Sequence, residues 1–152
     1  MALTNRGMYR LARAALANTS VPTNFYLLLV TSASAPTRAT NTMAELTEIT
    51  AGNGYTSGGI SIARNTTDWD TSTENDSDNT LTILLKDEVW TASGGTLPTS
   101  GSGAAYAILT DDNATLNSRE VIAYHSLGGD ISVGNGQPLT ISNFGFVFTQ
   151  GT

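Results

Sequence analysis

The chain has 152 residues, of which 13% are charged and 39% are hydrophobic, and its net charge is −6 with Lys86 as the only lysine. This length supports one domain with a single core, and so few basic residues argue against nucleic acid as a partner, because phosphate contacts need a basic surface. The lack of cysteine excludes disulfides and thiolate chemistry, and the longest apolar run, FYLLLV, is too short to cross a membrane.

The first predicted element is an amphipathic helix over residues 4–18, which Thr4 or Asn5 can cap and Asn18 can end. Its apolar stripe has helical spacing and consists of Met8, Leu11, Ala12, Ala15 and Leu16. At 100° per residue, Arg6, Arg10 and Arg13 fall together on the opposite side.

These three arginines make the start of the chain basic. The other 139 residues carry 13 acids and 4 bases, a net charge of −9. The arginines form either a solvated helix face or the contact surface of a docking arm that binds an acidic neighbour. Arg6, Arg10 and Arg13 are therefore the candidate protein-contact residues.

Next, residues 24–32 read NFYLLLVTS and are apolar on both alternating faces. Such a strand should be covered on both sides. We expect the core to cover one face, and the N-terminal helix or a second subunit to cover the other. A short second helix follows over residues 43–49, with Asn41 or Thr42 as its cap and Glu45 in its first turn.

The segment ELTEITAGNGYTSGG, residues 45–59, is rich in glycine, but it lacks the lysine and the spacing of a phosphate-binding loop. Its glycines are better explained as helix-ending and turn residues that permit positive φ. A strand is expected over residues 55–64, then a polar loop to residue 80, and then a strand over residues 81–91. The faces of this last strand alternate, and we expect Leu81, Ile83, Leu85 and Val89 on one face and Lys86, Glu88 and Trp90 on the other.

Further strands are predicted over residues 104–110, 119–127 and 138–148, separated by turns. In the last of these, Leu139 and Ile141 share one parity, whereas Phe144, Phe146 and Phe148 share the other. Since a slip of one residue exchanges the faces of a strand, we predict a bulge or bend near Ser142–Asn143. Gly145 is expected to lie close to another backbone.

These elements predict a mainly β protein: a jelly-roll-like antiparallel β-sandwich with an N-terminal amphipathic helix and one short extra helix. We expect residues 1–152 to form a single β-sandwich domain, with the helix over residues 4–18 as its docking arm.

The sequence offers no pattern that is typical of a catalytic, cofactor or metal site. His125 is the only histidine, so a typical zinc site is excluded, and we expect it to pack on its strand. The acidic loop 68–78 places oxygen ligands at alternate positions, but the glycine and glutamate of an EF-hand are replaced by Thr73 and Asn79. Whether this loop binds an ion stays open, and a solvated loop is the preferred interpretation.

A resemblance adds to this interpretation. Segments along most of the chain are similar to small virion proteins of tailed bacteriophages, namely LTNRGMYRL, PTNFYLLLVTSASAPT, ELTEITAGNGYTSGG, LKDEVWTASGG, AYAILTDDN, EVIAYHSLGG and SVGNGQPLTISN. The resemblance implies a structural role, often capsid decoration (a cement layer on the shell), and it transfers no functional residue.

We therefore expect a non-enzymatic capsid decoration protein located in the virion and assembled in the bacterial host cytoplasm. Its expected partners are the major capsid protein and copies of itself, as a homotrimer, with no nucleic acid, membrane, small-molecule substrate or cofactor. A tail or tail-fibre component is the first alternative. A carbohydrate-binding module that uses Trp69 or Trp90 as a stacking platform is the second.

Overall fold

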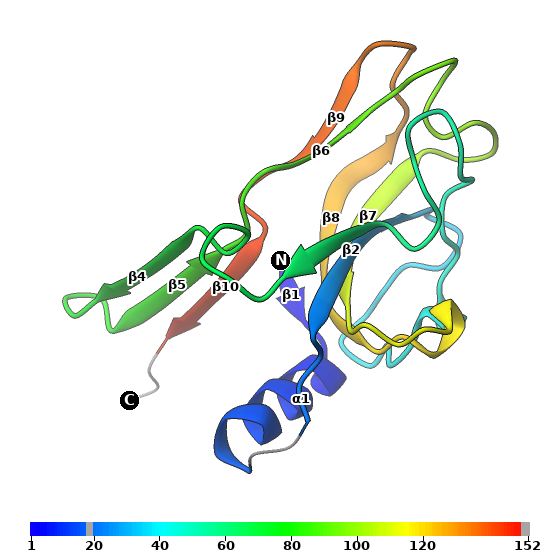
Figure 1. Ribbon diagram of the computed structural model, residues 1–152. Coiled ribbons are helices and arrows are strands. Elements are labelled where there is room, and N and C mark those ends of the chain that lie inside the picture. Colours follow the sequence, from blue (N-terminus) through cyan, green and yellow to red (C-terminus); the bar gives the residue numbers. More distant parts are fainter. Residues whose placement is uncertain (18–19, 150–152) are drawn as a thin grey trace.

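The computed structural model describes residues 1–17 and 20–149. It confirms a mainly β protein built from antiparallel sheets (Figure 1). Within the described residues the helical elements are α1 (Asn5–Leu16) and two 3-10 turns, η1 (Met43–Glu45) and η2 (Leu116–Ser118). The strands are β1 (Ala2–Leu3), β2 (Asn24–Val30), β3 (Ile60–Ala63), β4 (Thr71–Asn75), β5 (Thr80–Leu84), β6 (Glu88–Thr91), β7 (Ala104–Thr110), β8 (Val121–Ile131), β9 (Pro138–Ile141) and β10 (Gly145–Thr149).

The strands form three sheets. The largest has the order β1-β8-β7-β2-β3, a second has the order β10-β5-β4, and β6 pairs with β9. All pairings are antiparallel. The two four-stranded sheets of a jelly roll are not confirmed, because the strands divide five, three and two.

Helix α1 begins one residue later than predicted, because Thr4 is its cap. The helix ends at Leu16 with Ala17 as its C-terminal cap. The predicted end at Asn18 lies outside the described residues. This helix is not long and apolar enough to cross a membrane, and neither is any other helix in the described residues.

Strand β2 is buried on both faces, as its sequence predicts. Leu27 and Leu29 belong to the main core, and Leu28 and Val30 belong to a smaller cluster on the other side of the sheet. Helix α1 does not cover that second face, contrary to one of the two expectations. Met43 of η1 covers it instead, with Leu46, which follows η1, and Leu116 of η2.

The short second helix is reduced to the single turn η1. The Glu45 carboxylate accepts hydrogen bonds from the backbone amides of Asn41 and Thr42, at 2.8 and 3.1 Å. This is the reciprocal half of a capping box. Beyond Glu45 the chain is extended, since Leu46 has φ −121° and ψ 159°.

The glycines after η1 serve turns. Gly52 and Tyr55 exchange backbone hydrogen bonds of 2.8 and 3.0 Å across Asn53 and Gly54, which both have positive φ. An Asn-Gly pair with positive φ at both positions is the preferred two-residue hairpin turn. Gly59 approaches β2 so closely that a Cβ there would lie 2.0 Å from the Leu27 carbonyl oxygen. The turn interpretation of this segment therefore agrees with the observed backbone, but the helix-ending role predicted for its glycines is wrong, because η1 ends at Glu45 and Gly52 belongs to the hairpin turn.

The predicted bend near Ser142–Asn143 is present, because β9 ends at Ile141, Asn143 has φ 54° and β10 begins at Gly145. The segment that pairs with β9 and β10 is interrupted at the same point of the sheet. The predicted single strand over residues 81–91 is divided into β5 and β6 by Leu85–Asp87, and the Leu85 amide donates to the Phe144 carbonyl oxygen at 2.8 Å. Gly145 approaches the backbone as predicted, since a Cβ there would lie 2.1 Å from the Ile83 carbonyl oxygen.

This break corrects the predicted faces of residues 81–91. Val89 was expected on the apolar side with Leu85, but Val89 is exposed, while Trp90 is buried and only 4% exposed. The faces exchange because the three residues between β5 and β6 are not paired as a strand. The same break separates β4, β5 and β10, which we call the wing, from the β6–β9 pair. In Figure 1 the wing projects to the left of the body, and α1 lies at the bottom of the view.

The polar loop predicted after residue 64 is partly a strand. Residues 71–75 form β4, which pairs with β5 as a hairpin with Thr71 opposite Leu84 and Asn75 opposite Thr80. Little apolar signal marks it as a strand, because its side chains are Thr, Ser, Glu and Asn. Its pairing depends on backbone hydrogen bonds to β5.

Candidate functional site

Helix α1 is fixed to strand β8 at its first turn. The Thr4 side chain accepts a hydrogen bond from the Gly7 amide at 2.8 Å, and its hydroxyl donates to the Val121 carbonyl oxygen. The Thr4 amide donates to the Ile122 carbonyl oxygen at 3.0 Å. Gly7 lies against this backbone, because a Cβ there would be 2.0 Å from the same Ile122 oxygen. A residue with a side chain could not approach so closely.

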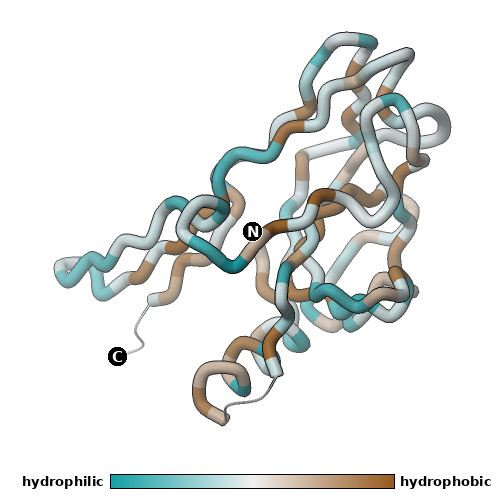
Figure 2. Tube along the Cα trace, viewed as in Figure 1, coloured by the Kyte–Doolittle hydropathy of each residue, from teal (hydrophilic) through white to brown (hydrophobic). Residues whose placement is uncertain are grey.

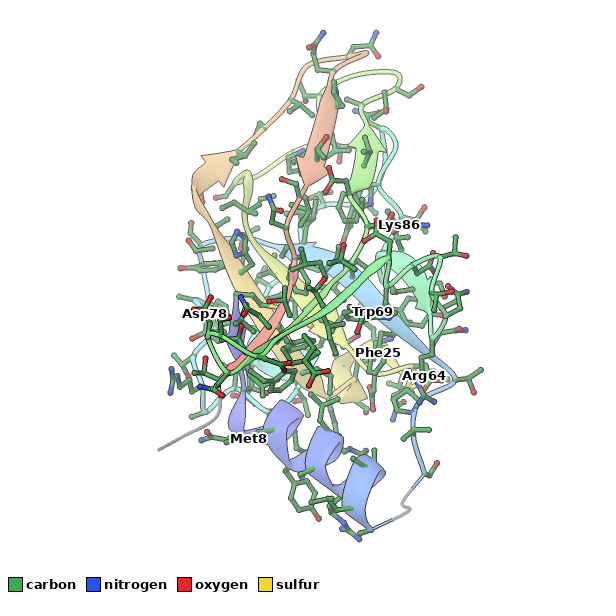
Figure 3. The ribbon with its side chains drawn as sticks, turned by 90° about the vertical axis from the view of Figure 1, so that its left-hand side faces the viewer. Met8, Phe25, Arg64, Trp69, Asp78 and Lys86 are labelled. Atoms are coloured by element: carbon green, nitrogen blue, oxygen red, sulfur yellow. The ribbon has the colours of Figure 1, made fainter. Side chains whose placement is uncertain are left out.

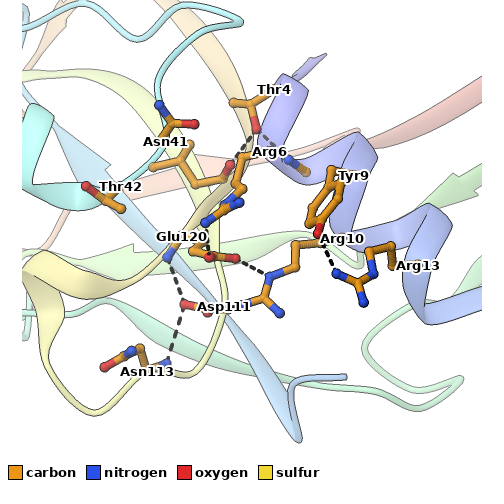
Figure 4. A network of polar contacts seen from close by, with 12 residues as sticks. Thr4, Arg6, Tyr9, Arg10, Arg13, Asn41, Thr42, Asp111, Asn113 and Glu120 are labelled. Carbon is orange, nitrogen blue, oxygen red and sulfur yellow. Dashed lines mark hydrogen bonds and ion pairs between the residues drawn. The ribbon is translucent and has the colours of Figure 1, made fainter. Parts of the chain in front are cut away.

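Two of the three candidate arginines bind carboxylates of their own chain (Figure 4). Arg6 Nη2 lies 2.8 Å from Glu120 Oε1. Arg10 donates through Nε to Glu120 Oε2, and its Nη2 lies 3.9 Å from Asp111 Oδ2. The Asp111 carboxylate also accepts the Glu120 amide at 2.9 Å. The acidic neighbour of the arginine stripe is thus supplied by the chain itself.

Electrostatics explains why these groups tolerate their partial burial. The hydrogen bond to Glu120 raises the pKa of the Arg10 guanidinium above its ordinary value, and the nearby carboxylates act in the same direction. Burial raises the pKa of Asp111, which the backbone hydrogen bonds it accepts oppose. Both carboxylates are mostly buried, so removing an arginine would leave a poorly solvated negative charge.

Arg13 differs from the other two arginines. Its side chain is exposed and contacts Tyr9, with the guanidinium carbon 5.3 Å from the centre of the ring and an Nη1–Oη hydrogen bond of 2.5 Å. Of the candidate contact residues, Arg13 is therefore the one whose charge projects away from the body. The contact role of all three remains a prediction.

Most of the predicted apolar stripe of α1 faces outward, contrary to the expected orientation, and Leu11 is its member that lies toward the body. Met8 is 56% exposed and Leu16 is 87% exposed. The side toward the body instead carries Gly7, Arg10, Leu11 and Ala14. We call the opposite side the outer helix face, which consists of Met8, Tyr9, Ala12, Arg13 and Leu16.

One face of the wing carries a cluster of apolar side chains. Cross-strand pairing sets Phe146 opposite Ile83 and Phe148 opposite Leu81, so these four side chains share one face of the wing. Glu74 pairs with Leu81 from β4 and lies on the same face. We call this surface the inner wing face: Glu74, Leu81, Ile83, Phe146 and Phe148. Figure 2 shows the brown, apolar stretches of β5 and β10 beside the teal tip of the hairpin.

A groove of about 170 Å³ lies between α1 and the inner wing face. Leu11 lines its helix side, and Ile83, Phe146 and Phe148 line its wing side. Phe25 and Trp69 also line it, with their rings edge to face at 6.1 Å between centroids (Figure 3). The lining is thus apolar on every side.

The remaining candidate residues take structural positions. Trp90 is buried, and Trp69 is partly buried, stacks on Phe146 at 6.2 Å between ring centroids and lines the groove. His125 is half-buried, lies edge to face with Phe144 at 6.4 Å, and its pKa is lowered by burial.

In the acidic segment, the Asp68 carboxylate binds Lys86 Nζ at 2.7 Å and accepts the Ala63 amide at 2.6 Å. These contacts lower the pKa of Asp68, with the hydrogen bond from Lys86 as the larger cause. Among residues 1–17 and 20–149, no group of three or more acidic or histidine side chains is placed to hold a metal ion.

Sequence reasoning missed Glu120 and Asp111 as partners of the arginines. A signal was available, because Asp111 directly follows β7 and Glu120 directly precedes β8. Consecutive antiparallel strands bring such positions together, and the Asp111 amide does donate to the Glu120 carbonyl oxygen at 3.2 Å. The exposure of the inner wing face had no comparable signal.

Comparison with known proteins adds no assignment. No family model and no curated protein matches the sequence, and no solved structure matches the fold.

Proposed function

We propose that the chain is a non-enzymatic structural protein of a tailed-bacteriophage particle, and that it decorates the outer shell as a cement protein. It would assemble in the cytoplasm of the bacterial host and remain in the virion. Its partners would be the major capsid protein and further copies of itself, with a homotrimer as the expected state.

The observation that carries this proposal is the exposed apolar surface on the two projecting elements. Leu16 on α1 is 87% exposed and Phe148 on the wing is 43% exposed, with Met8 and Leu81 also exposed nearby. Contiguous exposed apolar surface on a soluble domain marks a site of interaction. A protein that acts by contact needs such a surface on a rigid scaffold, and it needs no reacting group.

The sequence resemblance supports a role in a virion. The similar segments include the first half of α1 and the strands β2, β6 and β9 with most of β7 and β8, but none of the wing strands β4, β5 and β10. On a shell, many identical copies repeat each contact, so that individually weak contacts hold strongly together.

The copy number in purified particles tests the proposal. Quantitative mass spectrometry against the major capsid protein should find hundreds of copies per particle. A handful of copies would favour the tail or tail-fibre alternative, and absence from the particle would refute both. A glycan array covers the carbohydrate-binding alternative, for which we expect no signal because both tryptophans pack against other side chains.

A further inference from the structure

The outer helix face and the inner wing face are complementary in charge. Helix α1 contains no acidic residue. Arg6 and Arg10 bind Glu120 of their own chain, so Arg13 is the arginine that gives the outer helix face its positive charge. The wing hairpin, residues 71–84, contains Glu74, Asp76 and Asp78 and no basic residue. All three of these acids are exposed, and among the described residues none of them is within ion-pair distance of a basic side chain. Opposite charges placed this way favour association and fix its orientation.

The two faces are also complementary in apolar character and size. The outer helix face presents Met8 and Leu16, and the inner wing face presents Leu81 and Phe148 beside the groove. An apolar cavity of about 150 Å³ accepts one benzene-sized group, and the groove measures about 170 Å³. It therefore has room for one large apolar side chain, and not for a helix.

The two faces cannot meet within one chain. Thr4 and Gly7 fix the start of α1 against β8, and Arg10 binds Glu120 and Asp111 from the same side. This orientation turns the outer helix face away from the body. A helix from another molecule is needed to bring the complementary surfaces into contact.

We propose that the outer helix face of one copy binds the inner wing face of a second copy of this chain. An apolar side chain of the helix, Leu16 being the most exposed, fills the groove beside Phe148, and Arg13 lies near Glu74. The same contact repeated from copy to copy closes a ring, or it is made twice in a two-fold pair. The proposal concerns the isolated chain and does not depend on its role in a particle.

The test is the oligomeric state of the purified full chain, measured by sedimentation velocity over a range of concentrations. We expect a defined assembly for the natural sequence. Leu16→Glu and Phe148→Glu should each weaken association by about tenfold or more, because each replaces a buried apolar contact by a charge. Val147→Glu is the matched control, since Val147 lies on the same strand, points to the other face and is 63% exposed.

Charge exchange tests the orientation of the contact. Arg13→Glu and Glu74→Arg should each weaken self-association several-fold, the scale of an exposed ion pair turned to repulsion. An equimolar mixture of the two variants should associate again, because the altered helix of one chain meets the altered wing of the other. Circular dichroism confirms that each variant is folded.

Each possible result either supports or overturns the proposed contact. A chain that stays monomeric at all concentrations overturns the proposal, and so does a Val147→Glu effect equal to that of Phe148→Glu. Failure of the charge-exchanged mixture to associate overturns the pairing of these two faces. Copy number in the particle is a separate measurement, so the place of the chain in a virion can fail or stand without this contact, whereas a monomeric chain would also overturn the expected homotrimer.

Discussion

Replacing Arg10 should destabilise the fold, whereas replacing Arg13 on the same helix should not. Arg10 binds Glu120, whose side chain is 12% exposed, and lies near Asp111, whose side chain is 10% exposed. In Arg10→Met, Glu120 keeps only Arg6, and Asp111 loses the one cation that lies within ion-pair distance of it among the described residues. Fully buried carboxylates left unpaired cost about 3–5 kcal/mol, and exposed ion pairs contribute about 0–1 kcal/mol.

The magnitude for Arg10 lies between these limits. Its side chain is 41% exposed, so water reaches one side of the pair and screens it. We expect Arg10→Met to lower the free energy of unfolding by about 2 kcal/mol. Arg13→Met removes an exposed charge and should change it by less than about 0.5 kcal/mol.

The assay is urea unfolding at neutral pH with the Arg10→Met and Glu120→Gln single and double variants. All are made in the Phe148→Glu background, so that self-association does not contribute to stability. Groups in one ion-pair network show coupling energies of about 0.5–3 kcal/mol. Coupling near zero, or equal losses in Arg10→Met and Arg13→Met, would refute the assignment of Arg10 as an internal anchor.

Two further predictions concern single positions. Gly7→Ala should destabilise the protein by about 1–3 kcal/mol through overpacking, since the added Cβ would lie 2.0 Å from the Ile122 carbonyl oxygen. Alanine otherwise favours helix by about 1 kcal/mol over glycine, so a more stable variant in urea unfolding would contradict this packing. His125→Gln should reduce the loss of stability on acidification. Burial lowers the pKa of His125 below 6.5, so the unfolded chain takes up its proton first and stability falls as the pH drops through 6.5. Parallel stability curves for the two proteins between pH 7.5 and 5 would contradict this.

Changing Arg6, Arg10 and Arg13 together to glutamate is expected to have different effects when judged from the sequence and from the structure. From the sequence, that change should weaken contacts with partners and leave the fold intact. In the structure, two of the three new carboxylates would lie beside Glu120 and Asp111. Only the reversal of Arg13 separates binding from folding.

Local features of the fold could be predicted from the sequence because the residues concerned carry their own constraint. Strand β2 is apolar on both parities, and a run of this kind is stable only when both faces are covered. The apolar residues change parity between Ile141 and Phe144, so a regular strand would turn one of the two sets to the wrong face, and a bend is needed there. The Asn53–Gly54 pair adopts the positive φ values that its turn needs.

The orientation of α1 and the exposure of the wing were decided by tertiary structure alone. The helix has a charged side and an apolar side, and periodicity ranks the apolar side as the buried one. Here the close approach at Gly7 and the carboxylates of Glu120 and Asp111, more than 90 residues away in sequence, hold the other side against the body. Hydrophobic spacing shows which residues share a face of a helix. Contacts with residues far along the chain decide which face is covered, and in the described residues the outer helix face stays exposed.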